Sequence, residues 1–358
     1  MTSEDFDPDA VDRALLRHHG DLEATPGLLD FAVNVRPGGP PRWLRDRLAA
    51  ALDRIGRYPS PEEDAEARAA VAARHGRDPG EVLVLSGGAE GFALLPALRP
   101  RRAAIVHPSF TEPDIALDAA GLPVHRVMLG PEDGYRLRPE LVPEHADLVV
   151  IGNPTNPTSV LHPAEALRSL ARPGRVLVID EAFADATPGE TESLTSDRDV
   201  PGLLVLRSLT KSWALPGLRA GYALGAPELL ARLALHRPQW PIGTLVLEAV
   251  TACSSPEAVT EAATAAAALD RDRDRLVAEL NELPGVRVAA QPQAPFVLVH
   301  VADGAKVRDG LRRRGIAVRR GDTFPGLDTD HIRLAVRPPE QTAILLAALR
   351  AELIPEAA

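Results

Sequence analysis

Six short apolar runs follow one another between residues 82 and 206, and they constrain the fold more than any other feature. Helical patterns separate several of them, notably at residues 90–98, 112–120 and 164–171. Runs of this kind are typical of strands buried on both faces, in a mostly parallel sheet with helices on either side. In such a fold the ligand site lies at the carboxyl ends of the strands. The six runs are residues 82–85, 103–106, 124–127, 148–151, 176–179 and 203–206.

The pattern changes beyond residue 222, where helical patterns become longer and precede a second set of strands. This change predicts a smaller α+β domain in the C-terminal part. The first 40 residues are rich in loop signals, with a short helical pattern at 9–18 and a strand at 28–33. We therefore expect three parts: an N-terminal arm over 1–40 that packs with the small domain, a large domain over 41–245, and the small domain over 246–358.

Composition excludes several classes of function. The 358 residues carry a formal net charge of −10, which argues against nucleic acid as a partner. Cys253 is the one cysteine, and no Cys/His cluster has zinc-binding spacing, so no metal is expected. The acidic N-terminus lacks an apolar core, and no apolar run approaches membrane-spanning length. These features predict a cytoplasmic protein without a membrane partner.

Lysine is scarce in this chain. Among 40 basic residues only Lys211 and Lys306 are lysines, and the others are arginines. Arginine stays protonated and cannot form an imine with an aldehyde, so lysine must remain wherever that chemistry is needed. Lys211 follows the apolar run 203–206, at a predicted strand end, which suits a Schiff-base lysine. An ordinary surface lysine on a loop would also suit this position.

Other predicted strand ends carry residue types that suit pyridoxal phosphate. Asp180 follows the run 176–179 and could pair with the pyridine nitrogen, although a helix cap or loop aspartate would look the same. Ser86-Gly-Gly-Ala-Glu-Gly91 could offer amide donors to a phosphate, or could be a simple tight turn. Asn156, in Asn-Pro-Thr-Asn-Pro, could donate to the ring hydroxylate, or could belong to a plain turn.

Further side chains could complete such a site. Phe110 could stack on the pyridine ring or could belong to the core. Ser208, Thr210 and Arg219 surround Lys211 and could each reach a phosphate. Each residue is ordinary by itself, but their occurrence together at successive strand ends favours one cofactor site.

On these residues the chain resembles the fold-type I, or aspartate aminotransferase, superfamily of pyridoxal-phosphate enzymes, from residue 18 to about residue 336. The most specific motifs are Ser208-x-x-Lys211-x7-Arg219, Asp-Glu-Ala-Phe at 180–183 and Asn-Pro-x-Asn-Pro at 153–157. The branch it resembles most holds histidinol-phosphate aminotransferases and the threonine-phosphate decarboxylases of cobalamin synthesis. The resemblance implies a large cofactor-binding domain with a mostly parallel seven-stranded sheet between helices, and a small α+β domain.

The resemblance also implies roles for individual residues. Lys211 would bond to the cofactor aldehyde, Asp180 would pair with the pyridine nitrogen and Asn156 would donate to O3′. Tyr58 would reach the phosphate of a neighbouring subunit, which implies a homodimer. Arg333 would hold the substrate carboxylate. The phosphate would be held by Gly88, Ala89, Ser208, Thr210 and Arg219, and the further substrate-binding candidates are His18, Asn34, Arg319 or Arg320, and Arg337.

The decarboxylase branch is the better match at several places. Phe183 stands where aminotransferases of this group usually have tyrosine, and segments 30–37 and 324–328 also resemble the decarboxylases. His19 and Asp21 in His18-His-Gly-Asp21, and Arg320, depart from that pattern at positions that the resemblance places near the substrate's phosphate. The first expectation is therefore a pyridoxal-phosphate lyase that decarboxylates L-threonine O-3-phosphate. The alternative is a histidinol-phosphate aminotransferase or a related class I/II aminotransferase.

Two further classes remain open from the residues alone. The Ser208-x-x-Lys211 spacing is also found in acyl-serine hydrolases of the penicillin-binding type, but the accompanying Ser-Asp-Asn and Lys-Thr-Gly elements are missing. A non-catalytic regulator that binds pyridoxal phosphate is the other class, although no helix-turn-helix module is appended.

Overall fold

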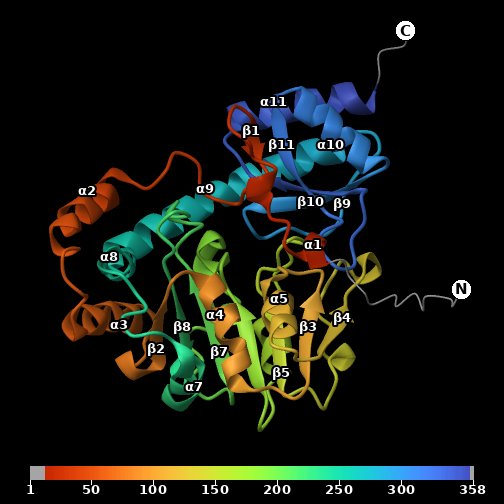
Figure 1. Ribbon diagram of the computed structural model, residues 1–358. Coiled ribbons are helices and arrows are strands. Elements are labelled where there is room, and N and C mark those ends of the chain that lie inside the picture. The colour runs from red at the N-terminus through yellow and green to blue at the C-terminus, as the bar shows by residue number, and fades with distance from the viewer. Residues whose placement is uncertain (1–12, 355–358) are drawn as a thin grey trace, which may run out of the picture.

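The computed structural model describes residues 13–354, and the predicted helical pattern at 9–18 lies partly outside this range. The chain forms two sheets stacked end to end, with helices around both (Figure 1). The larger sheet has seven strands and the smaller sheet has five. This confirms the predicted α/β class and the two sheets that it implies. The boundaries drawn at residues 40 and 245 stay a prediction.

The seven-stranded sheet has the strand order β2-β8-β7-β6-β5-β3-β4 and is parallel except for β8. All six predicted runs form strands in it. A seven-stranded sheet was expected from the resemblance, but the position of the seventh strand, β8, was not predicted, because its Gly-Tyr-Ala-Leu-Gly sequence is short and bounded by glycines. The strands are β2 (Val82–Leu85), β3 (Ala103–His107), β4 (Val124–Met128), β5 (Leu148–Gly152), β6 (Val176–Asp180), β7 (Leu203–Ser208) and β8 (Gly221–Gly225).

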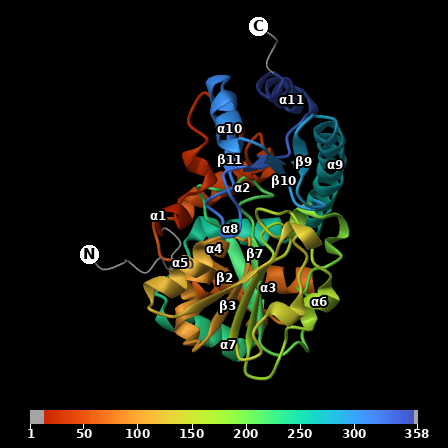
Figure 2. The same cartoon turned by 90° about the vertical axis from the view of Figure 1, so that its right-hand side faces the viewer.

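Alternate residues of these strands pack into two separate cores. Val149 and Ile151 of β5 belong to the core beneath α2, α3, α6 and α8, whereas Leu148 and Val150 belong to the core beneath α4, α5 and α7. Figure 2 shows α3 and α6 on one side of the sheet and α4, α5 and α7 on the other. Burial on both faces explains why these strands are continuously apolar. The helices are α2 (Arg42–Ala51), α3 (Pro61–His75), α4 (Gly88–Leu94), α5 (Glu112–Ala119), α6 (Ala164–Arg168), α7 (Pro227–Leu233) and α8 (Thr244–Cys253).

The five-stranded sheet has the order β1-β11-β12-β10-β9, with β1 parallel to β11 and the other pairs antiparallel. Its core contains residues from both ends of the chain, including Phe31 and Leu345. The strands are β1 (Leu29–Phe31), β9 (Val286–Val288), β10 (Phe296–Val301), β11 (Ile316–Arg320) and β12 (His331–Ala335). The remaining helices are α1 (Arg13–Leu16), α9 (Pro256–Asn281), α10 (Gly304–Arg313) and α11 (Pro339–Leu353).

The small sheet lies above the carboxyl edge of the large sheet (Figure 1). The ends of β2, β3, β5, β6 and β7 therefore point toward it, and the N-terminal segment, residues 18–36, crosses between the two. Within residues 13–354, no helix has the length and apolar character needed to cross a membrane.

Candidate active site

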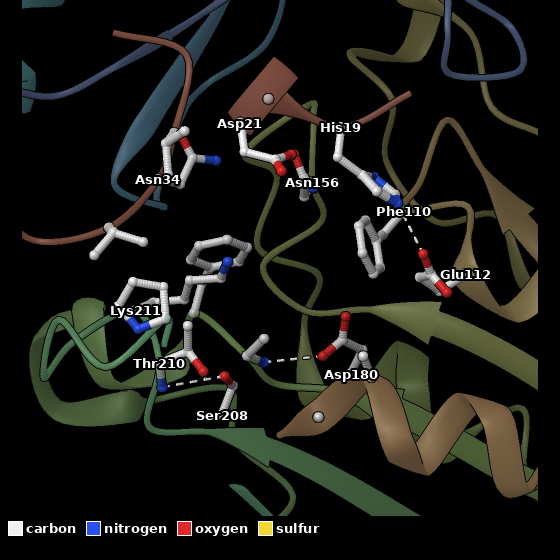
Figure 3. Close-up of a pocket in the computed structure, with 18 of the residues that line it drawn as sticks. His19, Asp21, Asn34, Phe110, Glu112, Asn156, Asp180, Ser208, Thr210 and Lys211 are labelled. Carbon is white, nitrogen blue, oxygen red and sulfur yellow. Dashed lines mark hydrogen bonds and ion pairs between the residues drawn. The ribbon is translucent and has the colours of Figure 1, made fainter. Parts of the chain in front are cut away.

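A pocket of about 390 Å³ lies between the carboxyl edge of the large sheet and the small sheet (Figure 3). Its wall comes from loops after five strands of the large sheet, from the N-terminal segment and from β11 and β12. Sequence reasoning places twelve of the lining residues at a site: Asn34, Gly88, Ala89, Phe110, Asn156, Asp180, Ser208, Thr210, Lys211, Arg219, Arg319 and Arg333.

Lys211 lies three residues beyond the end of β7 and points into this pocket (Figure 3). Its Nζ lies 5.9 Å from the centroid of the Phe183 ring. Burial lowers the pKa of Lys211 from its ordinary value of 10.5 to about 8, and the positive charges of Arg333 and Arg219 act in the same direction. A substantial fraction of the amine is therefore neutral, and so nucleophilic, near neutral pH.

This lowered pKa can be measured directly in the cofactor-free protein. Labelling of Lys211 by fluorodinitrobenzene, followed by peptide mass spectrometry, should reach half its maximal rate near pH 8. At that pH about half of the Lys211 amines are neutral, against less than about 1% for an amine of ordinary pKa. The Arg333→Ala variant removes one positive charge, so its midpoint should move upward. An unchanged midpoint near 10.5 in the wild type would contradict the buried environment of Lys211.

Asp180 is the last residue of β6, and its carboxylate lies at the floor of the pocket. Its Oδ1 accepts a hydrogen bond of 3.0 Å from the backbone N–H of Ala182. Burial raises the pKa of Asp180 from 3.8 to about 6, against the opposing effects of the Ala182 bond and of Lys211. The side chain is still an anion at neutral pH, so it can stabilise a positive charge placed beside it.

The loop after β2 and the end of the Lys211 loop form a narrow cradle. Gly87 has a φ of +79°, and a Cβ on it would lie 3.0 Å from the Arg219 guanidinium. A Cβ on Gly221 would lie 2.6 Å from the carbonyl oxygen of Arg207. Both positions therefore need glycine, for conformation at the first and for space at the second. Nearby, the buried Thr210 Oγ1 has no hydrogen-bond partner among residues 13–354.

Two arginines of the small sheet close the pocket from the opposite side. Arg319 of β11 and Arg333 of β12 are paired across the antiparallel strands, so both guanidiniums lie on the same face. Arg333 donates to Asn156 Oδ1 and to the carbonyl oxygen of Ala32. Arg319 donates to the carbonyl oxygen of His18. Arg319 Nη1 and Arg333 Nε are buried and have no partner within the described part of the chain.

Arg320, named as the alternative to Arg319, lies outside the pocket lining and donates to Asp322. Three further residues that sequence reasoning placed at the site lie elsewhere. Arg337 is outside the pocket lining, and its guanidinium donates to the carbonyl oxygens of Asp30, Val33 and Val35. It fastens the N-terminal segment, so we withdraw its assignment to the substrate.

His18 and Tyr58 are the other two. His18 pairs with Glu23 at 2.9 Å and does not line the pocket, whereas its neighbour His19 does. Tyr58 is 70% exposed, lies outside the pocket of its own chain and stacks on Trp240 with ring centroids 4.2 Å apart. Its contribution to a neighbouring subunit stays a prediction.

Several lining residues were missed by sequence reasoning. His19, Gly20 and Asp21 come from the N-terminal segment, and Glu112 comes from the start of α5. His19 Nε2 and Glu112 Oε1 are 2.7 Å apart, and the hydrogen bond with His19 lowers the pKa of Glu112. No strand end marks these positions. The available signal was the sequence His18-His-Gly-Asp21, which departs from the decarboxylase pattern at His19 and Asp21, although only His18 was named as a substrate-binding candidate.

Known proteins resemble this chain over most of its length. A family model described as aminotransferase class I and II matches residues 26–349. A histidinol-phosphate aminotransferase of Mycobacterium tuberculosis is 55% identical over 336 residues, which cover 94% of this chain and 90% of the relative. A threonine-phosphate decarboxylase of Salmonella typhimurium is 32% identical over 336 residues, with 90% of each chain covered. The structure of a histidinol-phosphate aminotransferase from Clostridium acetobutylicum has a TM-score of 0.83 at 25% identity, and the match covers 90% of this chain and 98% of that one.

Proposed function

Because the chain belongs to the aminotransferase class I and II family, we propose that it transfers an amino group between histidinol phosphate and a 2-oxo acid. Enzymes of this family use pyridoxal phosphate, which is therefore the cofactor of this chain. The observation that carries the choice of substrate is the 55% identity to a histidinol-phosphate aminotransferase over nearly the whole chain. The decarboxylase reaches only 32% over a similar length. This reverses the order of the two reactions expected from sequence alone.

The residues of the pocket fit pyridoxal phosphate. The cradle at Gly87 and Arg219 can receive the phosphate, and the unpartnered Thr210 hydroxyl can donate to it. Asp180 can pair with the pyridine nitrogen, and Lys211 is the amine that bonds to the aldehyde. When bound, the cofactor withdraws electrons from the carbon that carries the substrate's amino group. These residue roles are part of the proposal.

The side chains around the cofactor then orient, bind and move protons. Asp180 holds a negative charge at the floor of the pocket and so favours the protonated ring nitrogen. The bond from Arg333 to Asn156 Oδ1 fixes the orientation of that amide, which leaves its Nδ2 group as the donor. When it is not bonded to the cofactor, the Lys211 amine would hold or release a proton at its Nζ near neutral pH, because burial brings its pKa to about 8.

A product assay separates transamination from decarboxylation. Purified protein with pyridoxal phosphate, L-histidinol phosphate and 2-oxoglutarate should form glutamate in equal amount to the histidinol phosphate consumed. L-Threonine O-3-phosphate should give little carbon dioxide. Release of carbon dioxide from that substrate without glutamate formation would instead support the decarboxylase. The Lys211→Ala variant provides the blank for both reactions.

We also propose that the active protein is a homodimer. Tyr58 and Trp240 form an exposed stacked pair, 70% and 51% exposed in the single chain, which supports an additional contact at this surface. The acyl-serine hydrolase considered from the Ser208-x-x-Lys211 spacing is set aside, because the chain belongs to the aminotransferase class I and II family.

A further inference from the structure

Part of the pocket remains once the cofactor residues are set aside, and it forms a substrate compartment. The small sheet and the N-terminal segment both lie above it (Figure 3). Polar side chains there lack partners, which is typical of a surface that binds a ligand. The compartment is lined by Asp21, Asn34, Phe183, Arg319, Phe324 and Arg333.

Positive charge dominates one wall of this compartment. Arg319 and Arg333 are 2% and 5% exposed, and each has a buried nitrogen without a partner among residues 13–354. Asn34 lines the same pocket, and neither its Oδ1 nor its Nδ2 is bonded within the same range. An anionic group of the substrate, such as a phosphate, can satisfy these donors.

Asp21 supplies a negative charge to the same compartment. Gly20 allows the segment to pass close to Ala32, because a Cβ on Gly20 would lie 2.5 Å from the carbonyl oxygen of Ala32. Asp21, the next residue, directs its carboxylate into the pocket (Figure 3). Burial lowers the pKa of Arg319 to about 10, and the charges of Glu23 and Asp21 oppose that change, so Asp21 lies within electrostatic reach.

The other carboxylate at this side of the pocket is already engaged. Glu112 accepts a hydrogen bond from His19, whereas the Asp21 side chain is exposed to solvent. A substrate seated in the compartment would remove water from Asp21. The carboxylate would then need a donor from the substrate, since burial of an unpaired charge is costly.

The two candidate substrates differ in their ionised groups and in their net charge. L-Threonine O-3-phosphate carries a phosphate, a carboxylate and one ammonium, for a net charge of about −2 at neutral pH. Histidinol phosphate has no carboxylate and carries an imidazole, for a net charge of about −1 with the ring neutral. A carboxylate beside Asp21 would be repelled, whereas an imidazole N–H can donate to it.

We propose that Asp21 is a specificity-determining residue, which accepts a hydrogen bond from the imidazole of the substrate and disfavours phosphate monoesters that carry a carboxylate. This inference rests on the proposed function, which supplies histidinol phosphate as the substrate. The phosphate then lies toward Arg319 and the reacting amine toward Lys211, so the ring occupies the side nearest Asp21.

Equilibrium binding tests this assignment without turnover. The probes are 3-(imidazol-4-yl)propyl phosphate, which lacks the reacting amine, and propyl phosphate, which also lacks the ring. Calorimetry on the cofactor-loaded wild type should show tighter binding of the ring-bearing probe. In the Asp21→Asn variant, the ratio of the affinity for the ring-bearing probe to the affinity for propyl phosphate should fall about tenfold or more, because a hydrogen bond to a charged acceptor is lost. Propyl phosphate itself should bind to this variant equally well or better.

Two further variants serve as controls, one that keeps the negative charge at position 21 and one that removes a carboxylate elsewhere in the chain. Asp21→Glu keeps the carboxylate and should retain part of the preference for the ring. Asp199→Asn makes the same chemical change in an exposed loop before β7 and should leave both affinities unchanged. In turnover, Asp21→Asn should raise the KM for histidinol phosphate but not the KM for 2-oxoglutarate.

The outcomes separate this inference from the proposed function. An equal preference for the ring in wild type and Asp21→Asn would overturn the role of Asp21, whatever the activity. Failure of the wild type to form glutamate from histidinol phosphate would overturn the proposed function. A wild type that prefers propyl phosphate would overturn the placement of the ring.

Discussion

A Lys211→Ala variant is expected to lose the visible absorbance of lysine-bound pyridoxal phosphate, together with its activity. No other amine lines the pocket among residues 13–354, so no side chain can take over the bond to the cofactor aldehyde. The fall in activity should be at least about a thousandfold, equivalent to about 4 kcal/mol of transition-state stabilisation. Absorbance spectra of the purified holoenzyme and initial rates of glutamate formation provide the measurement.

The second lysine provides a matched control. Lys306 lies on the exposed face of α10, so Lys306→Ala should keep both the absorbance and the activity. Borohydride reduction of the wild-type holoenzyme should attach the cofactor to the peptide that contains Lys211. Attachment at Lys306, or a Lys211→Ala variant with normal spectrum and rate, would refute the assignment of Lys211.

An Asp180→Asn variant should lower the rate by about 100-fold to 1,000-fold, or about 3 to 4 kcal/mol. Asparagine has nearly the same shape and can still accept the bond from Ala182, but it carries no charge to favour the protonated ring nitrogen. The main effect should fall on kcat, since the cradle for the phosphate is left intact. Rates of glutamate formation at saturating substrate, compared with those of the wild type, measure it.

The same substitution should stabilise the cofactor-free protein at pH 8. The folded pKa of Asp180, about 6, lies above its unfolded value of 3.8, so its stabilising contribution is present below pH 3.8 and is lost as the pH rises through 6. Removing this buried charge should add up to about 3 kcal/mol to the free energy of unfolding at pH 8, and much less at pH 4. Urea unfolding at the two pH values tests this, and a destabilised variant at pH 8 would contradict it.

Most of the fold could be predicted because buried strands leave a strong local pattern. The six apolar runs became six strands of the large sheet, since burial on both faces demands continuous apolar sequence. β8 was missed because its sequence is short and bounded by glycines, which have low strand propensity. α3 was also missed, although Ser60 and Glu63 form a capping box that its sequence displays.

The residues of the candidate site also fall into those that a local sequence pattern marks and those that it does not. Lys211 and Asp180 could be located because each follows a buried strand, and the edge of a parallel sheet brings such residues together. His19 and Asp21 could be placed near the substrate only through the resemblance, because their position depends on the path of an irregular segment. Arg337 was misassigned because an arginine that binds backbone carbonyls has no distinguishing sequence pattern.

The way the N-terminal segment is fastened has a consequence for evolution. Arg319, Arg333 and Arg337 bind it through the backbone carbonyls of residues such as His18, Ala32 and Val33. These bonds do not depend on which side chains the segment carries. Except at Gly20, where a Cβ would meet the carbonyl oxygen of Ala32, mutations at its pocket-facing positions can therefore change the preferred substrate while the segment keeps its path. New specificities can then arise here in single steps at little cost to folding.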